Sequence, residues 1–180
     1  MTKLAGVALF ALAIGSGDAS AHTQSTVRDA ALSAAFVFNF AKFTDWPKLP
    51  SAAPIMACVY GDDAIAVALT DLVRGQNISG HAIEVRTSKD EAALRLCQVL
   101  FVAAAEIRRL QATLASLGAL PVLTVSDSTG FALTGGIIEM YVDDGKMRFA
   151  INVTAVERSG LHLNPRLLGL ARIVRSAHVP

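Results

Sequence analysis

The chain has 180 residues, of which 53% are hydrophobic and 17% charged, and its formal net charge is +1. This length suits one domain with or without a leader, and the high apolar content excludes a largely disordered chain. The absence of a basic run argues against nucleic-acid binding, and no stretch of 18 apolar residues predicts a membrane-spanning helix.

The N-terminus has the pattern of a secretory signal peptide. Lys3 precedes an uncharged apolar run from Leu4 to Ile14, and Ala19-Ser20-Ala21 supplies the small residues of a cleavage site. A core helix is the alternative interpretation of this run. We expect a signal peptide over residues 1–21, cleaved after Ala21, and one exported domain over residues 22–180, located in the periplasm of a bacterium.

The first element of the mature chain is predicted to be a helix from Thr26 to Phe43, because the segment is rich in alanine and lacks glycine and proline. Phe36, Phe40 and Phe43 recur at spacings of four and three, which places them on one helix face. The helix cannot pass Pro47, since a proline disfavours helical backbone at the residue before it.

Strands and helices are then predicted to alternate. Compact apolar or alternating segments indicate strands, and segments with helical spacing between turn residues indicate helices. The expected strands cover residues 55–60, 81–85, 97–103 and 121–125, and the expected helices follow Asp62 or Asp63 and cover residues 88–96 and 106–117. This alternation predicts a largely parallel sheet flanked by helices.

The last third of the chain has a different pattern. Residues 137–142 and 147–151 flank the turn sequence Asp143-Asp144-Gly145-Lys146, which predicts an antiparallel hairpin. A helix is expected from Val153 to Ser159, stopped by Gly160, and a final helix from Pro165 to Arg175. The predicted fold class is therefore a single α/β domain whose mostly parallel sheet ends in a C-terminal antiparallel hairpin.

Cys58 and Cys97 are the only cysteines, and exported compartments favour disulfides. They do not form a Cys-x-x-Cys motif, so a thioredoxin-type redox centre is not indicated. A bridge that closes a loop of about 40 residues adds about 4 kcal/mol in the chain-entropy model. Two buried free thiols are the alternative, because unpaired cysteine behaves as a small hydrophobe. We expect the disulfide.

Motifs that indicate catalysis or a bound cofactor are missing from the sequence. It contains no Gly-x-Ser-x-Gly, no P-loop and no Gly-x-Gly-x-x-Gly, and its four histidines are not at zinc-ligand spacing. We therefore predict a protein that is not an enzyme and has neither a cofactor nor a metal site.

A polar loop follows the strand predicted at residues 121–125. Ser126, Asp127 and Ser128 lie at this strand end, and loops of this kind line ligand crevices in open α/β sheets. A solvated turn is the alternative. The three residues are thus a candidate ligand crevice, which would make the protein a periplasmic small-ligand sensor acting on another membrane protein.

Aromatic residues gather where the first helix breaks into a loop. Phe40, Phe43, Trp46 and Pro47 lie at this junction, and Trp46 is the only tryptophan. Aromatic side chains at such a junction either seal the core or anchor a partner. Both interpretations stay open, and these four residues are the candidate partner-binding residues.

The chain resembles the YfiR family of small periplasmic proteins. The resemblance rests on an ordered set of short segments, which lie at residues 38–47 (FNFAKFTDWP), 123–127, 131, 135–138, 148–152, 159–161 and 167–171. Each segment is weakly specific alone, but together they span nearly the whole mature chain in order.

The resemblance implies a repressor of an inner-membrane diguanylate cyclase. Members of the family look like proteins that bind the periplasmic sensor region of the cyclase, which lowers cyclic-di-GMP and restrains biofilm formation. The resemblance also implies homodimers, and release by envelope stress, redox state or capture by an outer-membrane lipoprotein.

The family's sheet-spanning disulfide matches Cys58 and Cys97. Some members carry a second cysteine pair in the later half of the chain, and this sequence has none. A redox switch that depends on the second pair is therefore not expected here.

Overall fold

The computed structural model describes residues 18–87 and 90–176. The predicted signal peptide lies outside the described residues except for residues 18–21, which begin the first helix. Its cleavage after Ala21 stays a prediction. Within the described residues, no helix combines the length and apolar character needed to cross a membrane.

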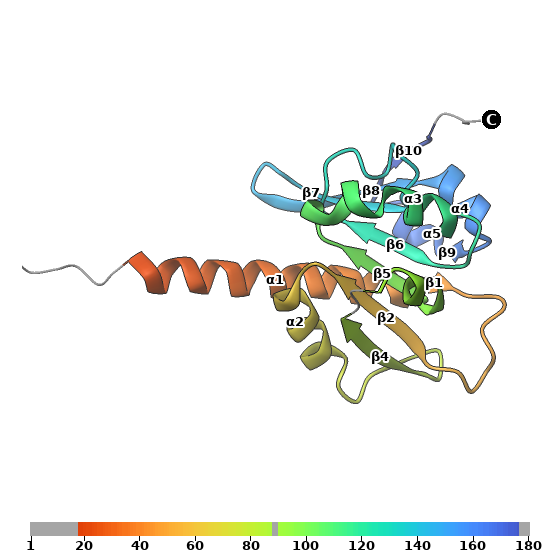
Figure 1. Cartoon of the computed structure of the whole chain (residues 1–180), viewed down its shortest axis with the longest axis horizontal. Coiled ribbons are helices and arrows are strands. Elements are labelled where there is room, and N and C mark those ends of the chain that lie inside the picture. The colour runs from red at the N-terminus through yellow and green to blue at the C-terminus, as the bar shows by residue number, and fades with distance from the viewer. Residues whose placement is uncertain (1–17, 88–89, 177–180) are drawn as a thin grey trace, which may run out of the picture.

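Helices and strands alternate along most of the chain (Figure 1). The α-helices are α1 (Asp18–Lys42), α2 (Asp63–Val73), α3 (Ile107–Leu117), α4 (Val153–Ser159) and α5 (Pro165–Leu168), and the 3-10 helices are η1 (Ala92–Leu96) and η2 (Ala104–Glu106). The strands are β1 (Thr44–Asp45), β2 (Ile55–Tyr60), β3 (Asn77–Ile78), β4 (His81–Thr87), β5 (Val99–Val102), β6 (Leu123–Ser126), β7 (Ile138–Asp143), β8 (Lys146–Asn152), β9 (His162–Leu163) and β10 (Arg172–Val174).

Within the described ranges, eight strands form one sheet in the order β10-β8-β7-β6-β5-β2-β4-β3. The five strands from β7 to β4 in this order run parallel to one another, whereas β8 is antiparallel to β7 and β3 is antiparallel to β4. A separate antiparallel pair joins β1 to β9. The predicted α/β class, with a mostly parallel sheet and a C-terminal antiparallel hairpin, is confirmed. The antiparallel direction begins only at β8, because β7 still runs parallel to β6.

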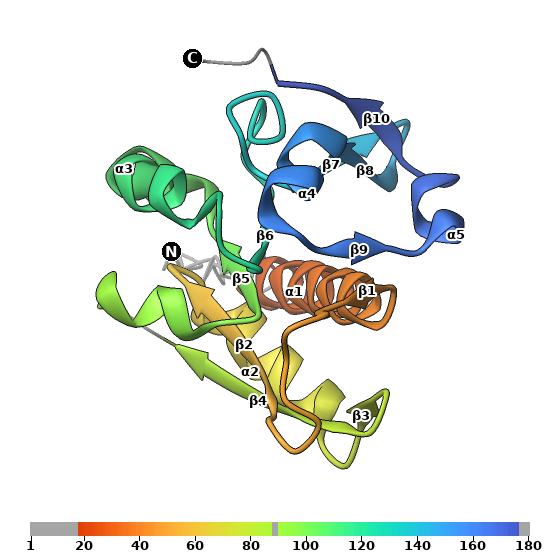
Figure 2. The same cartoon turned by 90° about the vertical axis from the view of Figure 1, so that its right-hand side faces the viewer.

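Helices cover both faces of the central strands, which is why these strands are apolar on both sides (Figure 2). In β2, Ala57 and Val59 belong to the core that contains α1 and α2. Cys58 and Tyr60 point the other way, into a second cluster that contains residues of η1 and α3. The alternation of side chains along one strand therefore divides the interior into two cores.

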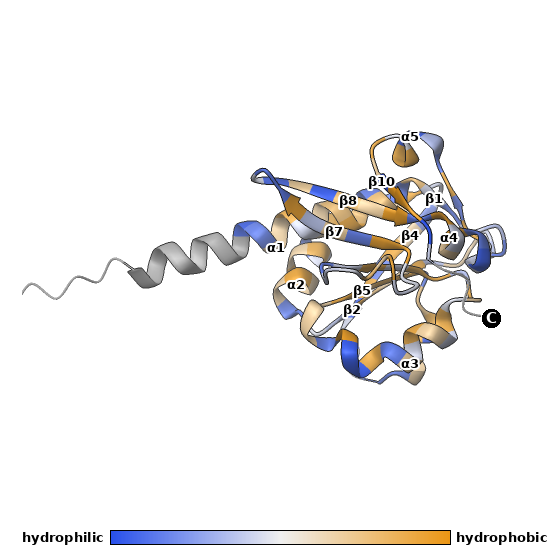
Figure 3. Ribbon diagram, turned by 90° about the horizontal axis from the view of Figure 1, so that it is seen from above, coloured by the Kyte–Doolittle hydropathy of each residue, from blue (hydrophilic) through white to orange (hydrophobic). Residues whose placement is uncertain are grey.

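Helix α3 packs against the sheet with one apolar side. Ile107, Leu110, Leu114 and Leu117 recur at helical spacing and all belong to the second core cluster. The polar residues between them give α3 its mixed colouring in Figure 3. The helix predicted over residues 106–117 is confirmed, with a start one residue later than expected.

Polar side chains cap the starts of two helices, and the sequence predicted the first of these caps. The Oδ1 atom of Asp62 accepts a hydrogen bond from the backbone N–H of Ile65 at 2.9 Å at the start of α2. Asn152 caps α4 through Ala155 N–H at 3.1 Å, and Gly160 ends the helix with a φ of 70°. The observed bounds of α4 are the predicted ones.

The predicted C-terminal helix over residues 165–175 is wrong. Helix α5 ends after one turn, and Arg172–Val174 form β10, which pairs in parallel with β8. Gly169 lowers the helical propensity after α5, and Ile173 and Val174 are β-branched residues that favour a strand. Leu170, just after α5, is 76% exposed.

Gly136 lies so close to Phe131 that replacing it with alanine is expected to destabilise the fold. A Cβ atom at Gly136 would lie 2.2 Å from the ring of Phe131, which is only 2% exposed and has no space to move. We expect Gly136→Ala to lower the free energy of unfolding by about 2 kcal/mol through overpacking, measured by urea denaturation.

The matched control is Gly169→Ala, because a Cβ there would meet its nearest atom at an ordinary 3.5 Å. Equal stability of the two variants would show that Phe131 does not constrain Gly136.

Candidate functional site

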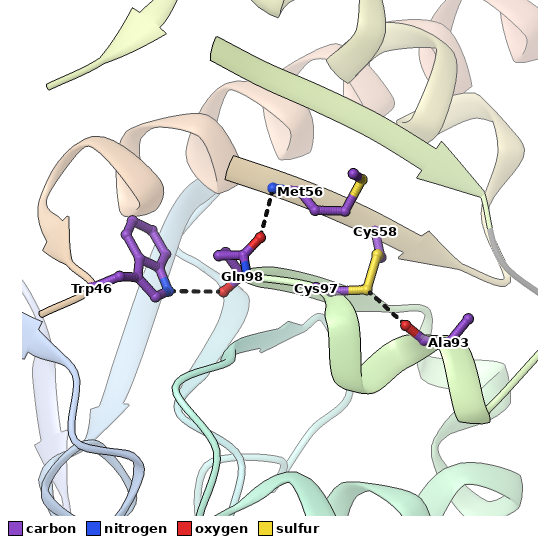
Figure 4. The surroundings of a disulfide bond; sticks show 6 residues. All are labelled: Trp46, Met56, Cys58, Ala93, Cys97 and Gln98. Atoms are coloured by element: carbon purple, nitrogen blue, oxygen red, sulfur yellow. Dashed lines mark hydrogen bonds between the residues drawn. A yellow bond between two sulfur atoms is a disulfide. The ribbon is translucent and has the colours of Figure 1, made fainter. Parts of the chain in front are cut away.

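Trp46 lies just after β1 and is attached to the start of a distant strand. Its indole Nε1 donates a hydrogen bond to the backbone oxygen of Gln98 at 3.2 Å, and its ring is partly buried against the main core (Figure 4). Core sealing, one of the two interpretations of this residue, fits these contacts. Its exposed portion leaves a docking role as a prediction.

Gln98 connects the starts of three neighbouring strands. Its side-chain Oε1 accepts a hydrogen bond from Met56 N–H at 2.9 Å, and its own backbone N–H donates to the Met56 oxygen at 2.9 Å. The Gln98 carbonyl that receives the Trp46 indole also accepts from Leu123 N–H at 2.8 Å. Trp46 is thereby held to the edge where β2, β5 and β6 begin.

The structure joins Cys58 and Cys97 in the disulfide that the sequence predicted, with their Cα atoms 5.9 Å apart (Figure 4). The bond links β2 to the residue that precedes Gln98. Both cysteines are buried, with exposures of 4% and 1%. The covalent link therefore lies in the second core, directly beside the backbone that holds Trp46.

The four candidate partner-binding residues do not share one exposed surface. Phe40 is 1% exposed, and its ring lies 5.0 Å from that of Phe149 between centroids. Phe43 and Trp46 are partly buried, and Pro47 is exposed. In this conformation Phe43, Trp46 and Pro47 can contact a partner directly. Phe40 cannot, because its side chain is buried in the core.

The pairing of β1 with β9 places the end of α1 beside a segment near the C-terminus. Thr44 lies opposite Leu163 and Asp45 opposite His162. The backbone N–H of Asn164 also donates to the Phe43 oxygen at 2.8 Å. The aromatic junction at the end of α1 thus borders a segment that is more than a hundred residues later in the chain.

The polar side chains of the candidate ligand crevice are engaged in local contacts. Ser126 is fully buried at the end of β6, and its Oγ accepts a hydrogen bond from Ser128 N–H at 3.1 Å. Asp127 is exposed, and its Oδ1 accepts from Ala104 N–H at 2.9 Å. These bonds hold the loop against η2, and its role as a ligand crevice stays a prediction.

Two hollows of about 350 Å³ each lie elsewhere, and neither is lined by Ser126, Asp127 or Ser128. One is at the carboxyl end of β2, where Tyr60, Glu106 and Arg109 form part of its wall. The other lies between α2 and β4. The chain passes from β2 to β4 on one side and then to β5 on the other, so the first hollow lies near a topological switch point.

Within the residues that the structure describes, no three His, Cys, Asp or Glu side chains gather in a way that could hold a metal ion.

A family model described as YfiR/HmsC-like matches residues 30–172. The chain belongs to the YfiR/HmsC-like family. The match extends from α1 to β10 and so includes both cores, the disulfide and the aromatic junction. The resemblance inferred from the ordered segments is thereby confirmed.

Membership of this family implies a periplasmic regulator of diguanylate cyclase signalling. The family is regulatory and non-catalytic, which agrees with the sequence-based prediction of a protein other than an enzyme.

Among solved structures, the chain is similar to a conserved domain protein from Vibrio cholerae O1 biovar El Tor. The two are 15% identical with a TM-score of 0.44, and the match covers 66% of this chain and 54% of that one. The chain thus spans about half the length of that protein.

Sequence reasoning missed Gln98, although it organises the surroundings of Trp46. The residue follows a cysteine at the start of an apolar strand, and nothing in its local pattern indicates three strand contacts. The one sequence feature that indicates where Gln98 lies is the predicted pairing of Cys58 with Cys97, which brings the neighbouring Gln98 to β2.

Proposed function

We propose that this protein represses an inner-membrane diguanylate cyclase by binding its periplasmic sensor region, and so lowers cyclic-di-GMP and restrains biofilm formation. The observation that carries the proposal is the family match over residues 30–172. The proposal also includes export to the periplasm after cleavage of residues 1–21.

Repression by binding requires a difference in affinity between two states of the cyclase. A ligand that binds both states equally shifts nothing, and moving an equilibrium from 1:99 to 99:1 takes about 10⁴-fold tighter binding to the favoured state. The repressor must therefore contact a part of the sensor region that changes between the inactive and active states.

The surface proposed for this contact is the aromatic junction formed by Phe43, Trp46 and Pro47. Partly buried aromatic side chains that border an exposed proline provide apolar area with little entropy to lose. The low charge content of the chain favours an apolar and aromatic interface over an ionic one. The contacts of Trp46 with Gln98 would present this surface in a fixed geometry.

The family resemblance is the basis for two further parts of the proposal. One is release from the cyclase by envelope stress, redox state or an outer-membrane lipoprotein, and the other is homodimer formation. A redox input would have to act on the Cys58–Cys97 disulfide, because the sequence holds no other cysteine.

A second candidate function is a periplasmic small-ligand sensor. The hollow beside Tyr60 and Arg109, near a topological switch point, favours it, and the loop at Ser126, Asp127 and Ser128 stays part of this alternative. A thermal-shift screen of the purified protein against periplasmic metabolites tests it.

The deciding experiment measures cyclic-di-GMP in cells from which the gene is deleted, with and without the candidate cyclase. We expect a rise on deletion that disappears when the cyclase is also absent. An unchanged level under several growth conditions would contradict the repressor function and favour the ligand sensor.

Replacing Trp46 tests the proposed surface. We expect Trp46→Ala to weaken binding of the purified cyclase sensor region at least tenfold, since truncated aromatic anchors typically cost about 2 kcal/mol or more. Calorimetry measures the binding, and circular dichroism verifies the fold.

Leu133→Ala is the control, because Leu133 is an apolar residue of another loop with 59% exposure. Trp46→Phe keeps most of the ring but removes the donor to Gln98. Full binding by a folded Trp46→Ala variant would remove this residue from the interface.

A further inference from the structure

One edge of the main sheet is open over most of its length. Strand β3 pairs with β4 only at two positions, Asn77 with Ala82 and Ile78 with His81. Beyond them, residues Ile83–Thr87 of β4 pair with β2 on their inner side, and the described part of the chain places no strand on their outer side. Figures 1 and 2 show β4 along this border of the molecule. Half of the backbone donors and acceptors in this stretch therefore face outward.

A groove follows this open edge. The hollow of about 350 Å³ between α2 and β4, the α2–β4 groove, is lined by Ala66, Val67 and Thr70 of α2 and by Val85 of β4. Val67 is 63% exposed although it is apolar. An open strand edge beside an apolar groove under a helix is the geometry in which an extended peptide adds to a sheet.

The charge of the groove specifies what kind of peptide it accepts. Asp63 and Asp71 are also among its lining residues, and no described lining residue is basic. Asp71 pairs with Arg74 at 2.9 Å, but both side chains are well exposed, so this pair is weak. The groove is therefore apolar in the middle and acidic at two places along its wall.

The separation of these two carboxylates sets the distance expected between the basic residues of a bound peptide. Asp63 and Asp71 are eight residues apart on one helix, which corresponds to about 12 Å along its axis. An extended chain covers this length in about four residues, at roughly 3.4 Å each. Residues four apart on a strand point to the same side, and the residue midway between them does too. The matching pattern is basic-x-apolar-x-basic.

An unpaired edge is often protected by charged side chains. Glu84 and Arg86 of β4 fit that role, since they are exposed and pair with each other at 3.5 Å. Side chains alternate along a strand, so these two project from the face opposite Val85. They leave the groove unoccupied.

We propose that the α2–β4 groove binds an extended segment of a partner protein with the pattern basic-x-apolar-x-basic, which adds to the sheet along β4. Backbone hydrogen bonds to residues 83–87 hold the segment, its apolar side chain contacts Val67 and Val85, and its basic side chains face Asp63 and Asp71. This surface goes beyond the proposed function and does not depend on it.

The test uses ¹⁵N-labelled protein purified from the periplasm and a blocked synthetic heptapeptide, acetyl-Thr-Lys-Thr-Val-Thr-Lys-Thr-amide. We expect its addition to shift the amide signals of Ile83–Thr87 and of α2, and to slow hydrogen exchange in that part of β4. The same peptide with glutamate in place of both lysines is expected to bind at least tenfold more weakly.

Val67→Lys is the blocking variant, because it places a cation in the groove at a position exposed enough to keep the fold. We expect it to reduce the affinity for the lysine peptide at least tenfold. Val142→Lys is the matched control, since Val142 is 68% exposed on the β7–β8 hairpin, and it should bind normally. Equal binding of the two peptides, shifts confined to another surface, or no effect of Val67→Lys would each overturn the proposal.

Discussion

Replacing both Cys58 and Cys97 with alanine is expected to lower the free energy of unfolding by about 4 kcal/mol, because the bridge closes a loop of about 40 residues in the unfolded chain. Both side chains lie in the second core, so the loss of sulfur atoms adds a small packing cost. Urea denaturation of the oxidised protein and the double variant measures the difference.

Trp46 makes this experiment informative about the candidate surface as well as about stability. It is the only tryptophan, so tryptophan emission, excited at a wavelength that tyrosine does not absorb, reports on the aromatic junction alone. Its partner Gln98 is adjacent to Cys97. The double variant is therefore expected to show a change in tryptophan emission before global unfolding.

The control is wild-type protein treated with a mild reductant under native conditions. Its cysteines are 4% and 1% exposed, so reduction should be slow until the protein opens. An unchanged urea midpoint in the double variant would contradict a stabilising role for the bridge.

Asn152→Ala is expected to lower the free energy of unfolding by about 3 kcal/mol. The side chain is fully buried, and its Nδ2 donates to the Ala132 oxygen at 2.6 Å while its Oδ1 caps α4 at Ala155 N–H. Losing a cap costs about 1 kcal/mol, and leaving a buried carbonyl without a donor costs about 1–3 kcal/mol. Thermal and urea unfolding measure the sum.

Asn164→Ala provides the matched control. Asn164 also caps a helix, by accepting from Arg166 N–H at 2.9 Å, but it is exposed and has no second buried partner. We expect a loss of about 1 kcal/mol or less there. Equal losses for Asn152→Ala and Asn164→Ala would show that the bond to Ala132 contributes nothing.

The candidate site was predictable only in part. The sequence indicated that Trp46 and Pro47 mark the end of the first helix, and it left core sealing and docking open. The hydrogen bond to Gln98 spans 52 positions, and no local pattern contains a contact of that range. For the same reason, the burial of Phe40 against Phe149 could not be read from the spacing of phenylalanines alone.

The two hollows and the open edge of β4 could not be predicted from the sequence either. A strand at an edge and a strand in the centre of a sheet have similar side-chain patterns when one face of each is buried. Only the strand order shows that, in the described part of the chain, β3 covers two residues of β4 and leaves the outer edge of the rest open.

Elements with local signals could be predicted from the residues alone. β2 has its predicted bounds because its apolar run stops at Gly61, and α4 has its predicted bounds because Gly160 ends its segment. The choice of cysteine partners was likewise predictable, since only two cysteines are present.

Other elements form only because folding brings a distant strand edge beside them. Residues 172–174 became a strand because β8 offers unpaired backbone groups to them, and β1 exists only because β9 lies beside it. A backbone hydrogen bond of a helix forms between neighbours in sequence, whereas that of a strand needs a partner that only the folded chain provides.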